Sequence, residues 1–183
     1  MNNIHLVTNY IEPEDIKILR SEMDLPSETN PYPEYYSNRN GGTSLPYNKI
    51  TIDMLKKYGD KSATYMKNFF NLNHEIYATK GYGSKWRPGL IGLPHVDDCG
   101  LEEFIEWSVV IYLNEPPEFD GGIIYFPEKD FTYIPVTGSA LFFPQKDLSY
   151  IHGITEVTRG YRYTMLFHYS KNIEFADPDL LDK

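Results

Sequence analysis

The pattern of apolar and polar residues along the chain changes its period near residue 75. The amino-terminal part, 1–74, spaces its apolar residues as amphipathic helices do, whereas residues 75–170 contain short β-branched and aromatic runs separated by Pro, Gly and Asp. Many short strands at close spacing are typical of a sandwich or barrel. The pattern therefore predicts an α+β protein, in which amino-terminal helices pack on one sheet of a jelly-roll core and a ligand binds at its open end.

Three helices are predicted in the amino-terminal part. The first begins at Pro13-Glu14-Asp15, because a proline and acidic residues favour the first turn of a helix. The other two span Ile50–Tyr58 and Lys61–Leu72, and Gly59-Asp60 is expected to separate them. Between the first helix and these two, Pro26 to Asn48 is dense in Pro, Gly, Asn, Ser and Tyr, which predicts a functional or disordered loop.

The second part of the chain contains five clear strand candidates. They are Trp107–Leu113, Ile123–Phe126, Phe131–Ile134, Ser139–Phe143 and Tyr161–Tyr169. A turn region is expected over Asn114 to Gly122. No internal repeat, low-complexity tract or linker divides the chain, so residues 1–183 are interpreted as one domain with a short tail after residue 170.

Composition and charge indicate the cellular compartment of this domain and the kinds of partner that it can bind. No apolar run is long enough to span a bilayer, and Met1–Tyr10 lacks the pattern of a secretion signal. A single cysteine, Cys99, excludes an internal disulfide framework and fits a reducing compartment, so we expect a cytoplasmic protein without a membrane partner. The net charge of −9 disfavours nucleic acid as a partner. The sequence does not indicate an oligomeric state.

His95, Asp97, His152 and Arg162 are the residues whose types and order point to chemistry. Residues two apart on a strand face the same side, so His95 and Asp97 can share one metal ion. Two imidazoles and one carboxylate can hold ferrous iron while leaving positions open for other ligands. By itself a His-x-Asp pair is equally well explained as a loop histidine beside a solvated acid. Arg162 could likewise be a surface arginine.

The surrounding motifs strengthen the metal interpretation through their common order. From about residue 75 to 170, the chain resembles the Fe(II)/2-oxoglutarate dioxygenases of the prolyl 4-hydroxylase type. The resemblance lies in His95-x-Asp97, His152 and five flanking motifs: Trp86-x-Pro88-Gly89, Tyr112-Leu113-Asn114, Gly121-Gly122, Pro135-x-x-Gly138-Ser139-Ala140-Leu141-Phe142-Phe143, and Val157-x-x-Gly160-x-Arg162-Tyr163. Each motif is short and degenerate, but their joint order and spacing are specific.

The resemblance implies a double-stranded β-helix fold, Fe(II), and 2-oxoglutarate and O2 as cosubstrates. By position it implies that the metal ligands are His95, Asp97 and His152. It also implies that the far carboxylate of 2-oxoglutarate is bound by Arg162 and Tyr112, with Ile124 as an apolar wall. A buried carboxylate needs a charged partner, and a guanidinium can supply a bidentate one. Tyr112 could instead be a core tyrosine.

Two residues depart from the family pattern. Trp86 stands where many members carry a tyrosine, and His168 stands where some carry a tryptophan. His168 is interpreted as a core or surface residue rather than a cosubstrate contact. Cys99 is interpreted as a small, partly buried side chain.

The substrate side is the least defined part of the site. Tyr82, Trp86 and Arg87 are its candidates, although each could be an ordinary loop residue. The segments Pro26–Asn48 and Ala78–Pro88 are candidates for loops that close over it.

The resemblance implies hydroxylation of a C–H bond with release of succinate and CO2. A prolyl residue in a peptide or protein is the leading substrate, because the nearest relatives by motif act there. A free amino acid or small metabolite is the alternative substrate. A non-catalytic, metal-binding jelly-roll that serves as an interaction module is the alternative outside the enzymes. The non-catalytic alternative is disfavoured by the presence of all four residues, His95, Asp97, His152 and Arg162.

Overall fold

The computed structural model describes residues 3–25, 45–46, 48–97 and 104–181. The helices are α1 (Pro13–Met23) and α3 (Lys49–Phe69), and short 3-10 turns occur at Pro127–Lys129, Leu148–Tyr150 and Ile173–Phe175. The strands are β1 (His5–Val7), β2 (Tyr77–Trp86), β3 (Gly92–His95), β4 (Trp107–Tyr112), β5 (Phe119–Gly121), β6 (Ile124–Phe126), β7 (Phe131–Tyr133), β8 (Ala140–Pro144), β9 (His152–Ile154), β10 (Val157–Gly160) and β11 (Arg162–Ser170).

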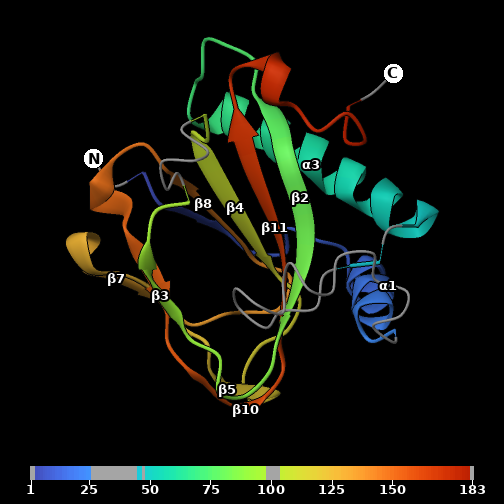
Figure 1. The fold of residues 1–183 in the computed structure, drawn as a ribbon, viewed down its shortest axis with the longest axis vertical. Coiled ribbons are helices and arrows are strands. Elements are labelled where there is room, and N and C mark those ends of the chain that lie inside the picture. Colours follow the sequence, from blue (N-terminus) through green and yellow to red (C-terminus); the bar gives the residue numbers. More distant parts are fainter. Residues whose placement is uncertain (1–2, 26–44, 47, 98–103, 182–183) are drawn as a thin grey trace.

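The strands form the two facing sheets of a double-stranded β-helix, which confirms the predicted fold class. The larger sheet has the order β1-β8-β4-β11-β2 and the smaller sheet has the order β3-β9-β6-β7. A short pair, β10 and β5, lies at one end of the roll (Figure 1). Every pairing is antiparallel, so segments far apart in the sequence meet across the roll.

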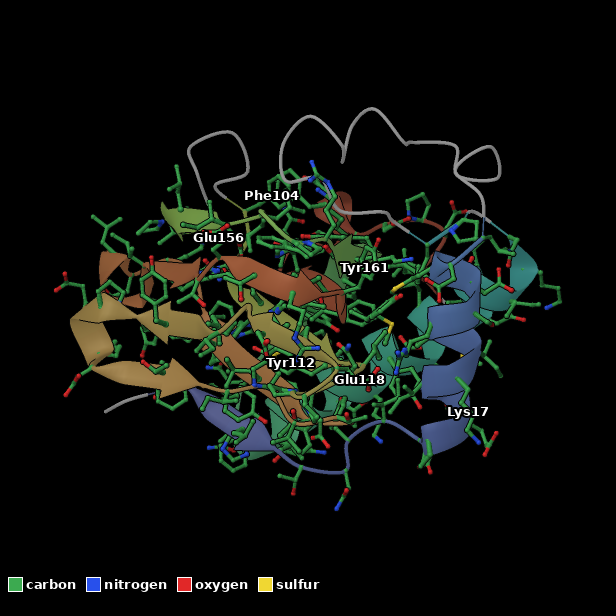
Figure 2. All side chains as sticks on the ribbon, turned by 90° about the horizontal axis from the view of Figure 1, so that it is seen from below. Lys17, Phe104, Tyr112, Glu118, Glu156 and Tyr161 are labelled. Carbon is green, nitrogen blue, oxygen red and sulfur yellow. The ribbon has the colours of Figure 1, made fainter. Side chains whose placement is uncertain are left out.

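The larger sheet separates two apolar cores, and β11 shows how. Its odd-numbered residues, Tyr163 to Tyr169, pack with side chains of α1 and α3 on the outer face of the sheet. Its even-numbered residues from Arg162 to His168 face the inside of the roll, because successive side chains of a strand alternate. Figure 1 shows α1 and α3 on one side of the larger sheet and β3 and β7 on the other. In the side view Tyr112 lies inside the roll, whereas Lys17 projects from the outer side of α1 (Figure 2).

The predicted break at Gly59-Asp60 is wrong, because α3 runs without interruption through both residues. Gly59 is buried where the helix crosses the sheet, and its carbonyl accepts a hydrogen bond of 3.0 Å from Tyr169 Oη. A Cβ at this position would lie 3.5 Å from Phe167. This is an ordinary contact distance, so the packing does not require glycine here. The helix continues because its apolar face is buried against the sheet, which outweighs the roughly 1 kcal/mol that glycine costs in a helix.

Substitution of Gly59 by alanine should stabilise the fold by up to about 1 kcal/mol, because the added methyl makes an ordinary contact and alanine favours the helix. Chemical denaturation would measure the free energy of unfolding. Gly81→Ala is the matched control: its Cβ would lie 2.8 Å from Phe167, so it should destabilise by about 1–3 kcal/mol. A loss of stability in Gly59→Ala would contradict this account of the helix.

The prediction that Ala78–Pro88 forms a closing loop is also wrong. Most of it is β2, a strand that pairs with β11 from Tyr77↔Ser170 to Trp86↔Arg162. Within β2, Gly83 faces Met23 and Leu45, where a Cβ would lie only 2.2 Å from the Met23 methyl. Glycine here marks close packing within a strand. The other loop candidate, Pro26–Asn48, lies almost entirely outside the described residues.

Two further segments differ from the sequence interpretation. The amino-terminal part contributes a strand as well as helices, because β1 pairs with β8 at the edge of the larger sheet. The expected turn region Asn114 to Gly122 contains the strand β5, which pairs with β10. Three-residue strands such as these are too short for an alternating pattern to reveal. Among the described residues, no helix is long and apolar enough to cross a membrane.

Candidate metal and cosubstrate site

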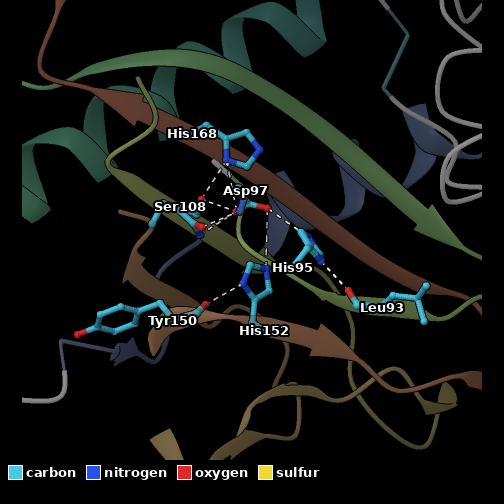
Figure 3. A network of polar contacts seen from close by, with 8 residues as sticks. Leu93, His95, Asp97, Ser108, Tyr150, His152 and His168 are labelled. Atoms are coloured by element: carbon cyan, nitrogen blue, oxygen red, sulfur yellow. Dashed lines mark hydrogen bonds and ion pairs between the residues drawn. The ribbon is translucent and has the colours of Figure 1, made fainter. Parts of the chain in front are cut away.

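The structure brings His95, Asp97 and His152 together at one end of the roll. His95 ends β3 and His152 begins β9, and the two are directly paired across these strands. Asp97 follows β3 in a bend. One ligand atom from each residue lies within 4.8 Å of the others, an arrangement that could hold a metal ion (Figure 3). The side chain of His95 is 44% exposed and that of His152 is 6% exposed, so the cluster opens on the His95 side.

Backbone carbonyls fix which nitrogen each histidine presents to the cluster. The Nδ1 of His95 lies 2.7 Å from the carbonyl oxygen of Leu93, and the Nδ1 of His152 lies 3.3 Å from that of Tyr150 (Figure 3). A carbonyl can only accept, so both Nδ1 atoms carry the hydrogen and both Nε2 atoms are left as donors of a lone pair to a metal. Such contacts commonly orient metal-binding histidines.

The electrostatics of the cluster keep Asp97 ionised. Burial by itself would raise the pKa of its carboxyl, but the nearby His168, the contact with His95 and the charge of His152 together hold this pKa far below its ordinary value. The same contact with Asp97 raises the pKa of His95, whereas burial lowers the pKa of His152. The cluster therefore combines one carboxylate with two imidazoles, a donor set that suits ferrous iron.

Three buried polar residues surround the Asp97 carboxylate, and the sequence interpretation assigned a site role to none of them. Ser108 Oγ and Gln145 Nε2 each donate a hydrogen bond to its Oδ2, at 2.6 and 2.8 Å. His168, expected to be a core or surface residue, is 4% exposed, and its Nδ1 lies 3.6 Å from the same oxygen. Ser108 could have been noticed as the polar residue that shares a strand face with Tyr112. No comparable sequence pattern indicated that Gln145 would lie at the site.

Arg162 and Tyr112 lie side by side deeper in the roll. Arg162 is 2% exposed and Tyr112 is fully buried, with the guanidinium carbon 5.4 Å from the centre of the tyrosine ring. Burial lowers the pKa of Arg162 and raises that of Tyr112. The contact between these two side chains opposes both pKa shifts. Apart from that mutual contact, Arg162 Nε and Nη2, Tyr112 Oη and Thr164 Oγ1 have no hydrogen-bond partner among the described residues. Buried donors without partners are costly, so this cluster is suited to an anionic ligand with several acceptor oxygens.

Ile124 and the glycine pair shape the wall of this buried cluster. Ile124 is 1% exposed and packs in the inner core with Tyr112. Gly122 has a positive φ of 63°, and a Cβ on it would lie 2.7 Å from Arg162 Cδ. The Gly121-Gly122 motif therefore leaves room for the Arg162 side chain, which a larger residue would displace.

The three substrate-side candidates do not lie together. Trp86 is 5% exposed, donates from Nε1 to Ser84 Oγ, and lies with its ring 5.7 Å from the Arg162 guanidinium carbon, at the buried cluster. Tyr82 lies further along β2, with its ring 5.9 Å from that of His168. Arg87 is exposed and donates to the carbonyl of Pro88. Cys99 lies outside the described residues.

A family comparison agrees with this geometry. Residues 89–170 match the model of the 2OG-Fe(II) oxygenase superfamily, a segment that includes both histidines, Asp97, Tyr112 and Arg162. The matched segment is similar to a 2OG-Fe(II) oxygenase domain and makes up a little less than half of the chain. The match supports a 2-oxoglutarate-dependent dioxygenase, a family that uses Fe(II), 2-oxoglutarate and O2, and His95, Asp97 and His152 supply a donor set that fits Fe(II). No curated protein sequence matches the chain closely enough to count as a relative.

Solved structures similar to this chain include three prolyl hydroxylases. A viral collagen prolyl hydroxylase from Paramecium Bursaria Chlorella virus-1, in its 2OG complex, has a TM-score of 0.69 at 16% identity, with 92% of this chain and 96% of that chain covered. A Pseudomonas putida prolyl-4-hydroxylase has a TM-score of 0.65 at 14% identity, covering 94% of each chain. A Trichoplax adhaerens prolyl hydroxylase, in complex with a hypoxia inducible factor peptide, has a TM-score of 0.70 at 16% identity, with 93% of this chain and 84% of that chain covered. At these identities the likeness shows the fold.

Proposed function

We propose that this protein is a 2-oxoglutarate-dependent oxygenase that hydroxylates a prolyl residue in a peptide or protein and releases succinate and CO2. In this proposal residues 1–183 act as one catalytic domain. His95, Asp97 and His152 hold Fe(II), and Arg162 with Tyr112 binds the far carboxylate of 2-oxoglutarate. The bound iron would supply the oxidising chemistry. The protein would hold the ligands, exclude water and position the C–H bond.

The observation that carries the proposal is the pairing of the metal cluster with a second, buried cluster of partnerless donors. Arg162 Nε, Arg162 Nη2 and Tyr112 Oη are buried without partners among the described residues, inside the same roll as His152. A carboxylate would accept from all three donors, and a planar guanidinium suits it in a bidentate way. Ile124 would contact the apolar methylenes between the two ends of 2-oxoglutarate.

The choice of a prolyl substrate is supported by the similar structures. Three of them are described as prolyl hydroxylases, and one holds a peptide. Tyr82 supports a substrate site next to the metal cluster, since it is only partly buried and its ring neighbours His168. Because the Trp86 ring lies 5.7 Å from the Arg162 guanidinium carbon, we propose that Trp86 forms a wall of the 2-oxoglutarate pocket rather than a substrate contact. Arg87 is the candidate for a contact with substrate at the surface.

An assay with candidate substrates should test both parts of the proposal. With Fe(II), 2-oxoglutarate and O2, the protein should form succinate, and proline-containing peptides should increase the rate and gain one oxygen atom by mass spectrometry. Free proline and other free amino acids should remain unmodified, and anaerobic samples should form no succinate. Oxidation of free amino acids alone would favour the small-metabolite substrate. Absence of any succinate from iron-loaded protein that is folded would contradict the enzymatic proposal.

A further inference from the structure

The two oxygens of the Asp97 carboxylate have different surroundings. Oδ1 faces the two histidines, at 3.3 Å from His95 Nε2 and 3.9 Å from His152 Nε2 (Figure 3). Oδ2 points the other way and accepts hydrogen bonds from Ser108 Oγ at 2.6 Å and Gln145 Nε2 at 2.8 Å. One oxygen is therefore directed at the metal cluster, while the lone pairs of the other are already engaged.

Gln145 holds the main chain of Asp97 as well as its side chain. The Gln145 Oε1 accepts a hydrogen bond of 2.8 Å from the Asp97 backbone N–H, while Nε2 donates to Oδ2. The N–H can only donate and the carboxylate can only accept, so the amide has a single satisfactory orientation. Gln145 is 1% exposed, and its own N–H donates to the Glu106 carbonyl at 2.9 Å. The Gln145 side-chain amide, which follows β8, therefore binds both the backbone N–H and the carboxylate of Asp97.

Ser108 is held in turn by His168. The single hydroxyl hydrogen of Ser108 goes to the Asp97 carboxylate, which can only accept. The His168 Nδ1, 3.0 Å from Ser108 Oγ, must then donate to the serine oxygen. This orders a chain of donors from His168 through Ser108 to Asp97 Oδ2 (Figure 3). Ser108 is 2% exposed and His168 is 4% exposed, so water does not compete for these hydrogen bonds.

We propose that Gln145 and Ser108 are positioning residues that restrict Asp97 to binding the metal through one oxygen. The inference rests on the proposed metal site. A carboxylate can bind a metal through one or both oxygens. If both Asp97 oxygens bound the metal, they would occupy one more coordination position. A chelating cosubstrate and O2 would then compete for the coordination positions that are left. By engaging Oδ2, the two residues keep Asp97 to a single position.

The first test compares Gln145→Met with the unchanged protein by titration of the metal-free form with Mn²⁺. Methionine keeps the length of glutamine but makes neither of the two hydrogen bonds to Asp97. We expect Mn²⁺ affinity to fall by about 10- to 100-fold, the range typical for loss of a residue that orients a ligand. Circular dichroism at the titration temperature establishes that both proteins are folded. Unchanged affinity would overturn the role of Gln145.

The second test separates positioning from general packing with a pair of variants at Ser108. Ser108→Ala removes the hydroxyl that donates to Oδ2, whereas Ser108→Thr keeps it. We expect the absorption spectrum of the Co²⁺-loaded protein to change in Ser108→Ala and in Gln145→Met, and to be restored in Ser108→Thr. Identical Co²⁺ spectra in all variants would overturn the proposal.

The same measurements distinguish failure of this inference from failure of the proposed function. An unchanged protein that binds neither Mn²⁺ nor Co²⁺ and forms no succinate would contradict the metal site itself. If the unchanged protein binds these metals and forms succinate, while the Gln145 and Ser108 variants match it in affinity and spectrum, only the inference fails.

Discussion

Substitution of Arg162 by methionine should raise the KM for 2-oxoglutarate by about 100-fold or more, equivalent to roughly 3 kcal/mol, because a buried carboxylate loses its charged partner. Arg162 is 2% exposed, and two of its nitrogens have no partner among the described residues, so the variant removes donors that are reserved for a ligand. Succinate formation at varied 2-oxoglutarate concentration measures the effect. Mn²⁺ affinity without 2-oxoglutarate should stay the same, since Arg162 does not contact the metal cluster.

Thermal unfolding provides the control for the Arg162 prediction. Without 2-oxoglutarate, Arg162→Met should not be less stable than the unchanged protein, because a buried guanidinium with partnerless nitrogens is itself costly. Tyr112→Phe should weaken 2-oxoglutarate binding by only about 5- to 10-fold, the value of one hydrogen bond. The loss of 2-oxoglutarate binding in Arg162→Lys should be intermediate between those of Tyr112→Phe and Arg162→Met, because lysine keeps the charge without the bidentate geometry. A KM unchanged in Arg162→Met would refute its assignment to the cosubstrate.

Substitution of His152 by alanine should abolish succinate formation and lower Mn²⁺ affinity by at least about 100-fold, because one of three metal donors is lost. His152 is buried, and its Nδ1–H is held by the Tyr150 carbonyl, which leaves Nε2 to the cluster. Calorimetric titration of metal-free protein with Mn²⁺ measures the loss. His74→Ala, which removes a histidine outside the cluster, is the matched control and should bind Mn²⁺ normally. Normal metal binding by folded His152→Ala would refute the ligand assignment.

Much of the candidate site could be predicted from the sequence, because it consists of short motifs in a fixed order. His95-x-Asp97, His152 and Arg162, with the strand motifs between them, indicated the family that residues 89–170 match. The β-branched and aromatic runs likewise predicted the strands β4 and β11 close to their observed bounds. Local periodicity is a property of the sequence itself, so such elements do not depend on knowledge of their neighbours.

The glycines show where local reasoning fails. Gly59 lies inside a helix, although Gly59-Asp60 was expected to separate two helices, and Gly83 lies inside a strand within a segment that was expected to be a loop. Gly83 is explained by its close neighbours Met23 and Leu45, whereas a side chain at Gly59 would make only an ordinary contact with Phe167, so that glycine is tolerated rather than required. A glycine that serves close packing looks the same in sequence as one that ends an element, and only the partner across the interface separates the two.

The sequence by itself determined the fold class, the resemblance to 2-oxoglutarate oxygenases and the donor types available for a metal ion and for a carboxylate. The tertiary structure decided how these donors are held. Ser108, Gln145 and His168 come from three separate segments and meet at one oxygen of Asp97, and Arg162 and Tyr112 are left with partnerless donors side by side. Hydrogen bonding depends on distances between atoms that the chain brings together only on folding. For this reason no pattern along the sequence could reveal them.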